Sequence, residues 1–277
     1  MGQASFAFSI MALCVKLASK TLPSLEIVFF RSLIGTVMIL FLIRAKRVSL
    51  WGKEKALMTL RGLSGFIALS LHFYTIAHLP LGTAVLLNYT GPIFAALFGA
   101  IFLKEKPSLF LAAMILLSFA GVYFLVEGKL QHWDWMVFLG LLSAVFVGIV
   151  YTSIRAIKGH ESDLTIIFYF VGVSMLGSLA FLGFGFKWPN LNEWLWLAGV
   201  GVGSFYGQLW MTKAVRRAPA CLVSPFSYLT PLLSFLYGLI FFKEKMTVYS
   251  LLGAFLIILG GSLISYFGTR PKGVVDE

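Results

Sequence analysis

The sequence has 277 residues, of which 59% are hydrophobic and only 12% are charged, and its mean hydropathy is +0.92. A soluble domain carries about 25% charged residues, so this chain lacks the polar surface that a water-soluble globule needs. The formal net charge is +11, but the lysines and arginines lie between apolar runs and form no single patch, which argues against a nucleic-acid partner. Cys14 and Cys221 lie far apart in apolar stretches, so we expect no disulfide, metal site or other cofactor.

Ten apolar segments are long enough to cross a bilayer, which takes about 20 residues as a helix. In chain order they are residues 2–18, 25–43, 56–77, 83–103, 108–126, 134–154, 164–186, 191–212, 220–242 and 247–267. The first is short and has a cleaved signal peptide as an alternative, but it lacks an N-terminal positive charge and a small-residue cleavage site. We interpret it as a span, so the sequence predicts an all-α integral membrane protein with ten transmembrane helices.

The basic residues between the spans predict the orientation. With the N-terminus inside, fifteen lysines and arginines, Arg61 among them, fall at inner positions and six at outer positions, while Arg31 lies within a span. Cytoplasmic loops are enriched in Lys and Arg. We therefore expect a multi-pass protein of the inner (cytoplasmic) membrane with both termini in the cytoplasm.

An internal repeat relates the two halves of the chain. A shift of 139 residues aligns Tyr89 with Tyr228, Pro92 with Pro231, and Lys104-Glu105-Lys106 with Lys243-Glu244-Lys245. Each copy holds five spans, and an odd number places the second copy in the opposite orientation. The sequence thus predicts two inverted five-helix repeats, residues 1–128 and 129–277, around a central cavity. Inverted repeats are a common plan of secondary transporters.

Prolines and small residues are expected to shape the packing of these spans. Pro92 and Pro231 lie near the middle of the membrane, where each is expected to kink its helix and to take part in gating. Small residues recur at every fourth position in the eighth span, at Gly199, Gly203 and Gly207, which predicts close helix packing.

Ionisable side chains within spans are candidates for function because they are costly there. Arg31 lies inside the second span, and its planar guanidinium suits a carboxylate of a substrate, although snorkelling to the headgroups is an alternative. Lys16 and Glu26 lie near the same outer edge and could pair across helices in a structural role, and Glu105 and Glu244 are expected to be solvated or to cap helices. Because this leaves few candidate proton carriers, exchange or facilitated flow is as compatible with the sequence as proton coupling.

Further polar and aromatic residues are expected to line the cavity and to bind the substrate. They are His72, Tyr74, Asn88, Tyr89, Tyr206, Gln208, Trp210, Ser227 and Tyr228. Any one of them could instead only join helices by hydrogen bonds. Together they predict a largely apolar, aromatic pocket with a few polar groups.

Several segments resemble the EamA-type members of the drug/metabolite transporter superfamily. Residues 24–31, which follow Lys16 and end at Arg31, resemble the second-helix signature, and residues 83–125 and 222–264 resemble the closing part of the repeat in each half. The resemblance implies ten helices, cytoplasmic termini, a central cavity and transport of metabolites such as amino acids or related organic solutes. Phe170 stands where the first half has Arg31, so a cationic site on this element is one-sided.

The sequence therefore predicts a secondary transporter that moves a small organic metabolite by alternating access, as a monomer or weak homodimer. A membrane-embedded enzyme is an alternative, but no span carries a catalytic carboxylate pair or a recognised catalytic or phosphate-binding motif. A scaffold or sensor that transports nothing is a third possibility.

Overall fold

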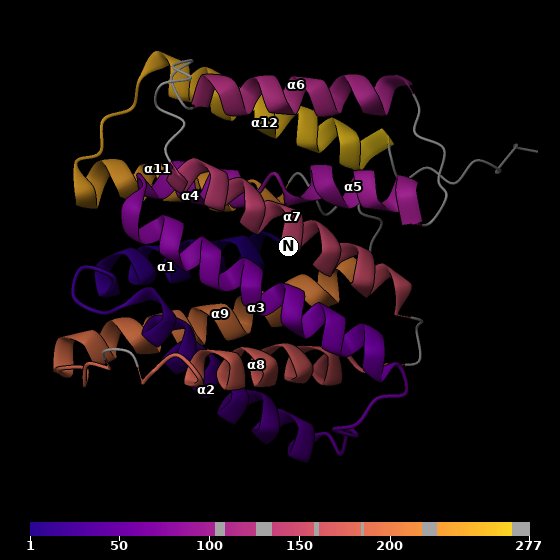
Figure 1. Ribbon diagram of the computed structural model, residues 1–277, viewed down its shortest axis with the longest axis vertical. Helices are drawn as coiled ribbons and strands as arrows, with labels where there is room; N and C mark the ends of the chain where they lie inside the picture. Colours follow the sequence, from indigo (N-terminus) through magenta and orange to yellow (C-terminus); the bar gives the residue numbers. More distant parts are fainter. Residues whose placement is uncertain (103–108, 126–134, 158–160, 184–185, 218–225, 268–277) are drawn as a thin grey trace, which may run out of the picture.

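The computed structural model describes residues 1–102, 109–125, 135–157, 161–183, 186–217 and 226–267, and these residues form eleven α-helices and no strand (Figure 1). The helices are α1 (Gly2–Ala18), α2 (Ser24–Ala45), α3 (Lys55–His78), α4 (Leu81–Asn88), α5 (Gly91–Phe102), α6 (Leu109–Leu125), α7 (Trp135–Ala156), α8 (Asp163–Leu179), α9 (Leu191–Arg217), α11 (Leu229–Phe242) and α12 (Val248–Phe267). The predicted boundary between residues 128 and 129, the Lys104-Glu105-Lys106 triplet and Cys221 lie outside the described residues.

Every predicted span contains a helix, which confirms the fold class. By length and composition α2, α3, the α4–α5 pair and α7 qualify as spans, and several shorter helices are strongly apolar. Large apolar side chains face outward, as Leu116 (70% exposed), Leu176 (63%) and Ile240 (66%) illustrate, whereas many serines and threonines are buried. This arrangement suits a bundle whose surroundings are lipid.

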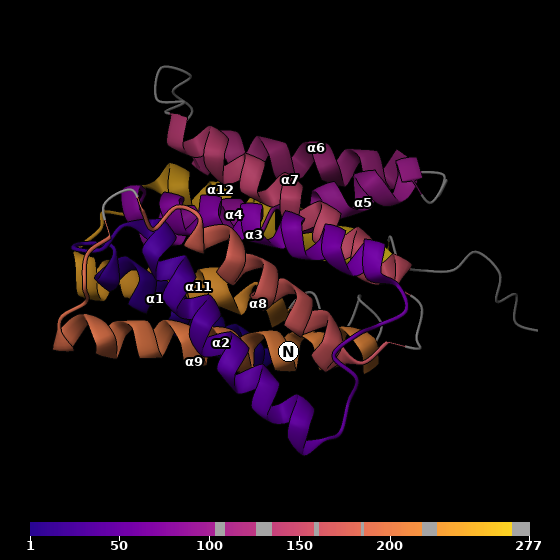
Figure 2. The same ribbon diagram turned by 60° about the horizontal axis from the view of Figure 1, so that its bottom comes forward.

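The helix pairings of one half recur in the other. Helix α1 packs on α9 as α7 packs on α3, and α11 packs on α1 as α5 packs on α7. The equivalent helices α2 and α8, α4 and α11, and α6 and α12 pack on one another. In both views α6 lies at one edge of the bundle and α2 at the opposite edge (Figures 1 and 2). The repeat seen in the sequence is therefore also a repeat of contacts.

The fourth span is broken rather than kinked. Between α4 and α5 the backbone N–H and the hydroxyl of Thr90 both donate to the carbonyl oxygen of Leu87, at 3.1 and 2.7 Å, which tightens the end of α4. Pro92 then falls in the first turn of α5, where a missing N–H leaves no helical bond unmade. Pro231 lies in the first turn of α11, directly after the turn at Tyr228. The two prolines thus begin new helices, which corrects the expectation that they kink continuous ones.

The glycines of the eighth span allow α9 to approach α1 closely. A Cβ at Gly199 would lie 2.7 Å from Sγ of Cys14, and one at Gly203 would lie 3.0 Å from the carbonyl oxygen of Ala7. Gly207 also lies against α1. The predicted close packing along this stripe is confirmed.

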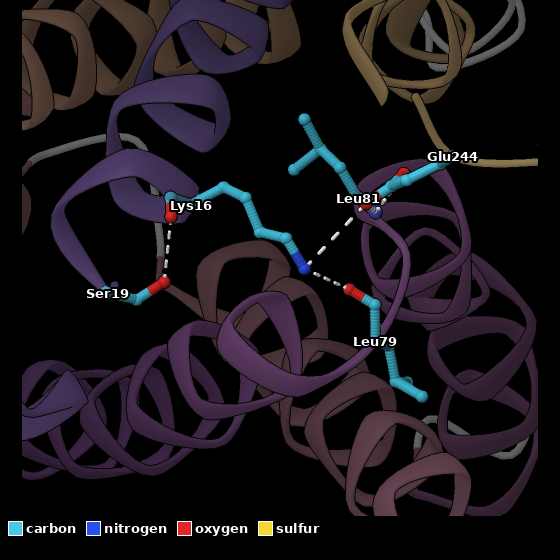
Figure 3. Close-up of polar contacts among 5 residues, drawn as sticks. All are labelled: Lys16, Ser19, Leu79, Leu81 and Glu244. Atoms are coloured by element: carbon cyan, nitrogen blue, oxygen red, sulfur yellow. Dashed lines mark hydrogen bonds and ion pairs between the residues drawn. The ribbon is translucent and has the colours of Figure 1, made fainter. Parts of the chain in front are cut away.

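A polar contact joins the two halves at the end of the bundle where α1 finishes (Figure 3). Lys16 Nζ donates to the carbonyl oxygen of Leu79 at 2.6 Å and lies 3.8 Å from Oε1 of Glu244. The Glu244 carboxylate accepts from the backbone N–H of Leu81 at 2.8 and 3.0 Å. Leu81 is the first residue of α4, so a carboxylate from the second half caps a helix of the first. We call Lys16, Leu79, Leu81 and Glu244 the Lys16–Glu244 clamp.

The clamp confirms the capping role expected of Glu244 and corrects the partner expected for Lys16. The predicted partner, Glu26, instead accepts from the backbone N–H of Lys187 at 3.2 Å. Sequence proximity to one membrane edge favoured the Lys16–Glu26 pair, but the segment after α11 brings Glu244 to Lys16 through the α1–α11 contact.

Candidate functional site

A cavity of about 140 Å³ lies at the centre of the bundle. An engineered apolar cavity of about 150 Å³ in another protein holds benzene, so this one accommodates a small organic group. Its lining comes from α1, α2, α3, α4, α7, α8 and α9 and from the starts of α5 and α11. Residues of both repeats thus line this central space.

The cavity brings together a majority of the residues proposed from the sequence. The lining includes Arg31, His72, Asn88, Tyr89, Pro92, Gln208 and Ser227. Among them Asn88 Nδ2 donates to Ser143 Oγ at 2.6 Å, which ties α4 to α7. Contact between these residues and a substrate stays a prediction.

Tyr74, Tyr206 and Trp210 lie outside the cavity, which corrects their predicted placement. Tyr74 is 38% exposed, and its ring centroid lies 4.3 Å from that of His78. Tyr206 is 40% exposed, and its ring centroid lies 5.3 Å from that of Trp210. Tyr74 is two residues from His72, and Tyr206 and Trp210 flank Gln208 by two. Two residues along an α-helix correspond to a rotation of about 200°, so these side chains point away from the cavity.

Tyr228 and Pro231 lie behind the lining rather than in it. Tyr228 is 2% exposed, and its ring centroid lies 6.2 Å from that of Tyr89, its equivalent in the first repeat. Its hydroxyl packs against Gly261 of α12. The two tyrosines therefore form a buried aromatic contact between the broken fourth span and the start of α11.

Arg31 points into the cavity and not toward a bundle end. Its side chain is 2% exposed, its Nε donates to Ser204 Oγ at 2.6 Å, and its Cζ lies 4.8 Å from the ring centroid of Phe170. Phe170 is the residue of the second repeat that is equivalent to Arg31. The sequence predicted a cation on only one of these two equivalent positions. In the structure the two residues are in contact, with the guanidinium of Arg31 over the aromatic face of Phe170.

Arg61 is a site residue that the sequence analysis missed. It was counted with the inner loops, yet it is 2% exposed and lines the cavity. Its Cζ lies 4.3 Å from the centroid of Phe170, and its Nη2 donates to Gln208 Oε1 over a long 3.5 Å. A usable signal existed, because Arg61 and His72 are eleven residues apart and so share one face of a helix.

The charge of the cavity is unbalanced. None of the described lining residues is acidic, whereas two are arginines. Nη1 of Arg31 and both Nε and Nη1 of Arg61 are buried without a hydrogen-bond acceptor among the described residues. A charge within a membrane bundle normally has a partner, so the two unneutralised guanidiniums make this cavity the candidate functional site.

Apolar packing separates the cavity from the end that carries the Lys16–Glu244 clamp. Ala18, Ile76 and Leu81 are fully buried in one cluster there. The lining of α3 runs from Arg61 to His72 and stops before the last turn. The cavity therefore extends from the middle of the bundle toward the opposite end.

A helical membrane bundle with a repeated architecture and a charged central cavity belongs to the class of membrane transporters rather than enzymes. The chain is a member of the EamA-like transporter family, which it matches over residues 3–127 and 134–266.

Similar proteins agree with this class. The chain is 35% identical to the pseudopaline exporter CntI of Pseudomonas aeruginosa over 92% of this chain and 91% of that protein. It is 25% identical to a riboflavin transporter of Vibrio cholerae over 97% of this chain and 92% of that protein. A solved crystal structure with 20% identity has a TM-score of 0.67 and covers 97% of this chain and 95% of that chain, which supports the fold alone.

Proposed function

We propose that this protein is a secondary transporter that moves a small organic metabolite across the cytoplasmic membrane by alternating access, with both termini in the cytoplasm. The observation that carries the proposal is a central cavity that is lined by residues of both repeats and carries two buried arginines. Inverted repeats can exchange conformations, and this exchange moves the opening from one side of the membrane to the other.

The Lys16–Glu244 clamp supports the alternating step. It ties the end of α1 and the α3–α4 junction to the segment after α11, and the lining of the cavity extends away from it. In the proposed orientation the clamp lies at the outer face, so this structure represents a state closed to the outside. Opening requires the clamp to break, because Glu244 cannot cap α4 once α11 moves away.

We propose export as the direction of transport. The support is the 35% identity with a relative named as an exporter. The cavity, closed at the proposed outer face, is the state that would load a solute from the cytoplasm.

Reconstitution into proteoliposomes tests the function. Vesicles containing only this protein should show saturable efflux of a loaded organic solute, while protein-free vesicles should not. A Lys16→Cys/Glu244→Cys variant, with Cys14 and Cys221 replaced by serine, should lose flux when crosslinked by a short thiol reagent and regain it on reduction. Unchanged flux in the crosslinked protein would contradict alternating access, and no flux of any solute would favour a scaffold or sensor.

Thiol labelling tests the proposed orientation. Trp51 (70% exposed) and Trp188 (73% exposed) lie at opposite ends of the bundle. With a membrane-impermeant maleimide on intact cells, Trp188→Cys should label and Trp51→Cys should label only after permeabilisation. The reverse pattern would contradict cytoplasmic termini.

A further inference from the structure

Arg31 and Arg61 form one cationic unit although they come from different helices. Both Cζ atoms lie over the ring of Phe170, at 4.8 and 4.3 Å from its centroid, so their separation cannot exceed the sum of these distances. Gly65 permits this arrangement, because a Cβ there would lie 2.7 Å from Cδ2 of Phe170 and 3.2 Å from Nη1 of Arg61. The cations therefore lie within reach of a single small molecule.

Each guanidinium is held by one neutral side chain and keeps further donors free. Ser204 Oγ accepts a hydrogen bond only from Nε of Arg31. Gln208 Oε1 lies 3.5 Å from Nη2 of Arg61, at the limit of hydrogen-bond distance. Nη1 of Arg31 and Nε and Nη1 of Arg61 remain without an acceptor among the described residues. A guanidinium fork matches a carboxylate, which can accept two parallel hydrogen bonds.

Two like charges in this setting repel each other and are poorly solvated. A resident acidic side chain would neutralise them, but no acidic residue is present among the described lining. A ligand with one acidic group would leave one guanidinium uncompensated. The two guanidiniums are hydrogen-bonded to different side chains, Ser204 and Gln208, which favours one acidic group for each guanidinium.

We infer that the transported substrate is an organic acid with two acidic groups, one bound by Arg31 and the other by Arg61, with Phe170 holding both guanidiniums in place. This inference rests on the proposed transport function. Both cations belong to the first repeat, and the equivalent positions in the second repeat are Phe170 and Val200. Part of the remaining wall, with Phe8, Met11 and Val147, is apolar and suits the carbon skeleton of the substrate.

Binding to matched ligands tests the substrate class. In detergent at constant ionic strength, the thermal stability of the purified protein is titrated with linear dicarboxylates from malonate to suberate and with glutaramate, which replaces one carboxylate of glutarate by an amide. At least one diacid should stabilise the protein, and glutarate should bind about 30-fold or more tightly than glutaramate, as expected for loss of one buried charge pair.

Variants separate a ligand role from a structural role. In Arg31→Gln and in Arg61→Gln, glutarate and glutaramate should bind alike, because only one fork remains. Without ligand both variants should be at least as stable as the wild type, since each removes an uncompensated charge.

Arg44→Gln is the matched control, because Arg44 is on the same helix as Arg31 but exposed. This variant should keep the preference for the diacid. Arg31→Lys and Arg61→Lys keep the charge if a glutamine variant does not fold.

Several results would overturn the inference. They are equal affinity for glutarate and glutaramate, an equal shift from inorganic phosphate alone, no shift with any diacid, or a diacid preference that survives both glutamine substitutions. Flux in proteoliposomes distinguishes the two proposals. Transport of a neutral or cationic solute would contradict the substrate class only, whereas diacid binding through both arginines without any flux would contradict transport only.

Discussion

The Lys16–Glu244 clamp and the Arg31–Arg61 pair both place charge among apolar helices, but they differ in how that charge is neutralised. Lys16 and Glu244 compensate each other and also satisfy backbone groups of the α3–α4 junction. Arg31 and Arg61 share an aromatic ring and have no acidic partner among the described residues. A lysine and a glutamate that neutralise each other serve to hold helices together. Two arginines without an acidic partner are available to an anionic ligand that enters and leaves.

The largest expected effect concerns the incomplete pair. Arg31→Lys should reduce substrate affinity nearly as much as Arg31→Ala, about 30-fold or more, because an ammonium keeps the charge but loses the fork and the Nε bond to Ser204. The measurement is the Kd of well-folded variants compared at equal yield. Wild-type affinity in the lysine variant would remove Arg31 from direct contact with the substrate.

The clamp should respond to mutation in the opposite way, through conformation rather than affinity. Glu244→Gln weakens a charged helix cap by about 1–2 kcal/mol, which corresponds to a roughly five- to thirtyfold larger fraction open at the clamp end. A thiol at the lining position of Ala12 should then react faster with an impermeant reagent added from outside. Lys245→Gln is the control, because Lys245 follows Glu244 in the sequence but is exposed and outside the clamp. Equal labelling rates in Glu244→Gln and the wild type would show that the clamp does not set access.

A smaller effect is expected from the packing that positions Arg61. Gly65→Ala places a methyl group against Phe170 and Arg61 and should lower diacid affinity by about tenfold through a cost of 1–2 kcal/mol. Gly172→Ala, on the same helix as Phe170, is the matched control, because no atom of another helix lies within 4 Å of the added Cβ. Similar affinities of the two variants would indicate that the guanidiniums tolerate displacement.

The smallest effect is expected from the two prolines that begin half-helices. Pro92→Ala or Pro231→Ala supplies an N–H and favours continuation of the helix through the break, which should slow transport by about threefold while folded yield changes less. Initial rates normalised to protein in the vesicles provide the measurement. If both variants transport at the wild-type rate, the breaks do not shape a gate.

The sequence predicted the helices and the repeat well, because spans depend on local hydrophobicity and the repeat on identity at a fixed spacing. It predicted the site less completely. Tyr74 was proposed for its chemistry although it lies two residues from His72 and faces away, and Arg61 was assigned to a loop although it shares a face with His72. The Lys16–Glu244 contact depends on how α11 packs on α1, which no local pattern encodes.

Whether a diacid crosses the membrane through the central cavity is tested most directly by efflux from proteoliposomes loaded with the dicarboxylate that binds best. The wild-type protein should release it at a saturable rate, and the Arg31→Gln/Arg61→Gln variant, reconstituted to the same density, should release it no faster than protein-free vesicles. Equal efflux from the wild type and the double variant would contradict transport through the arginine pair.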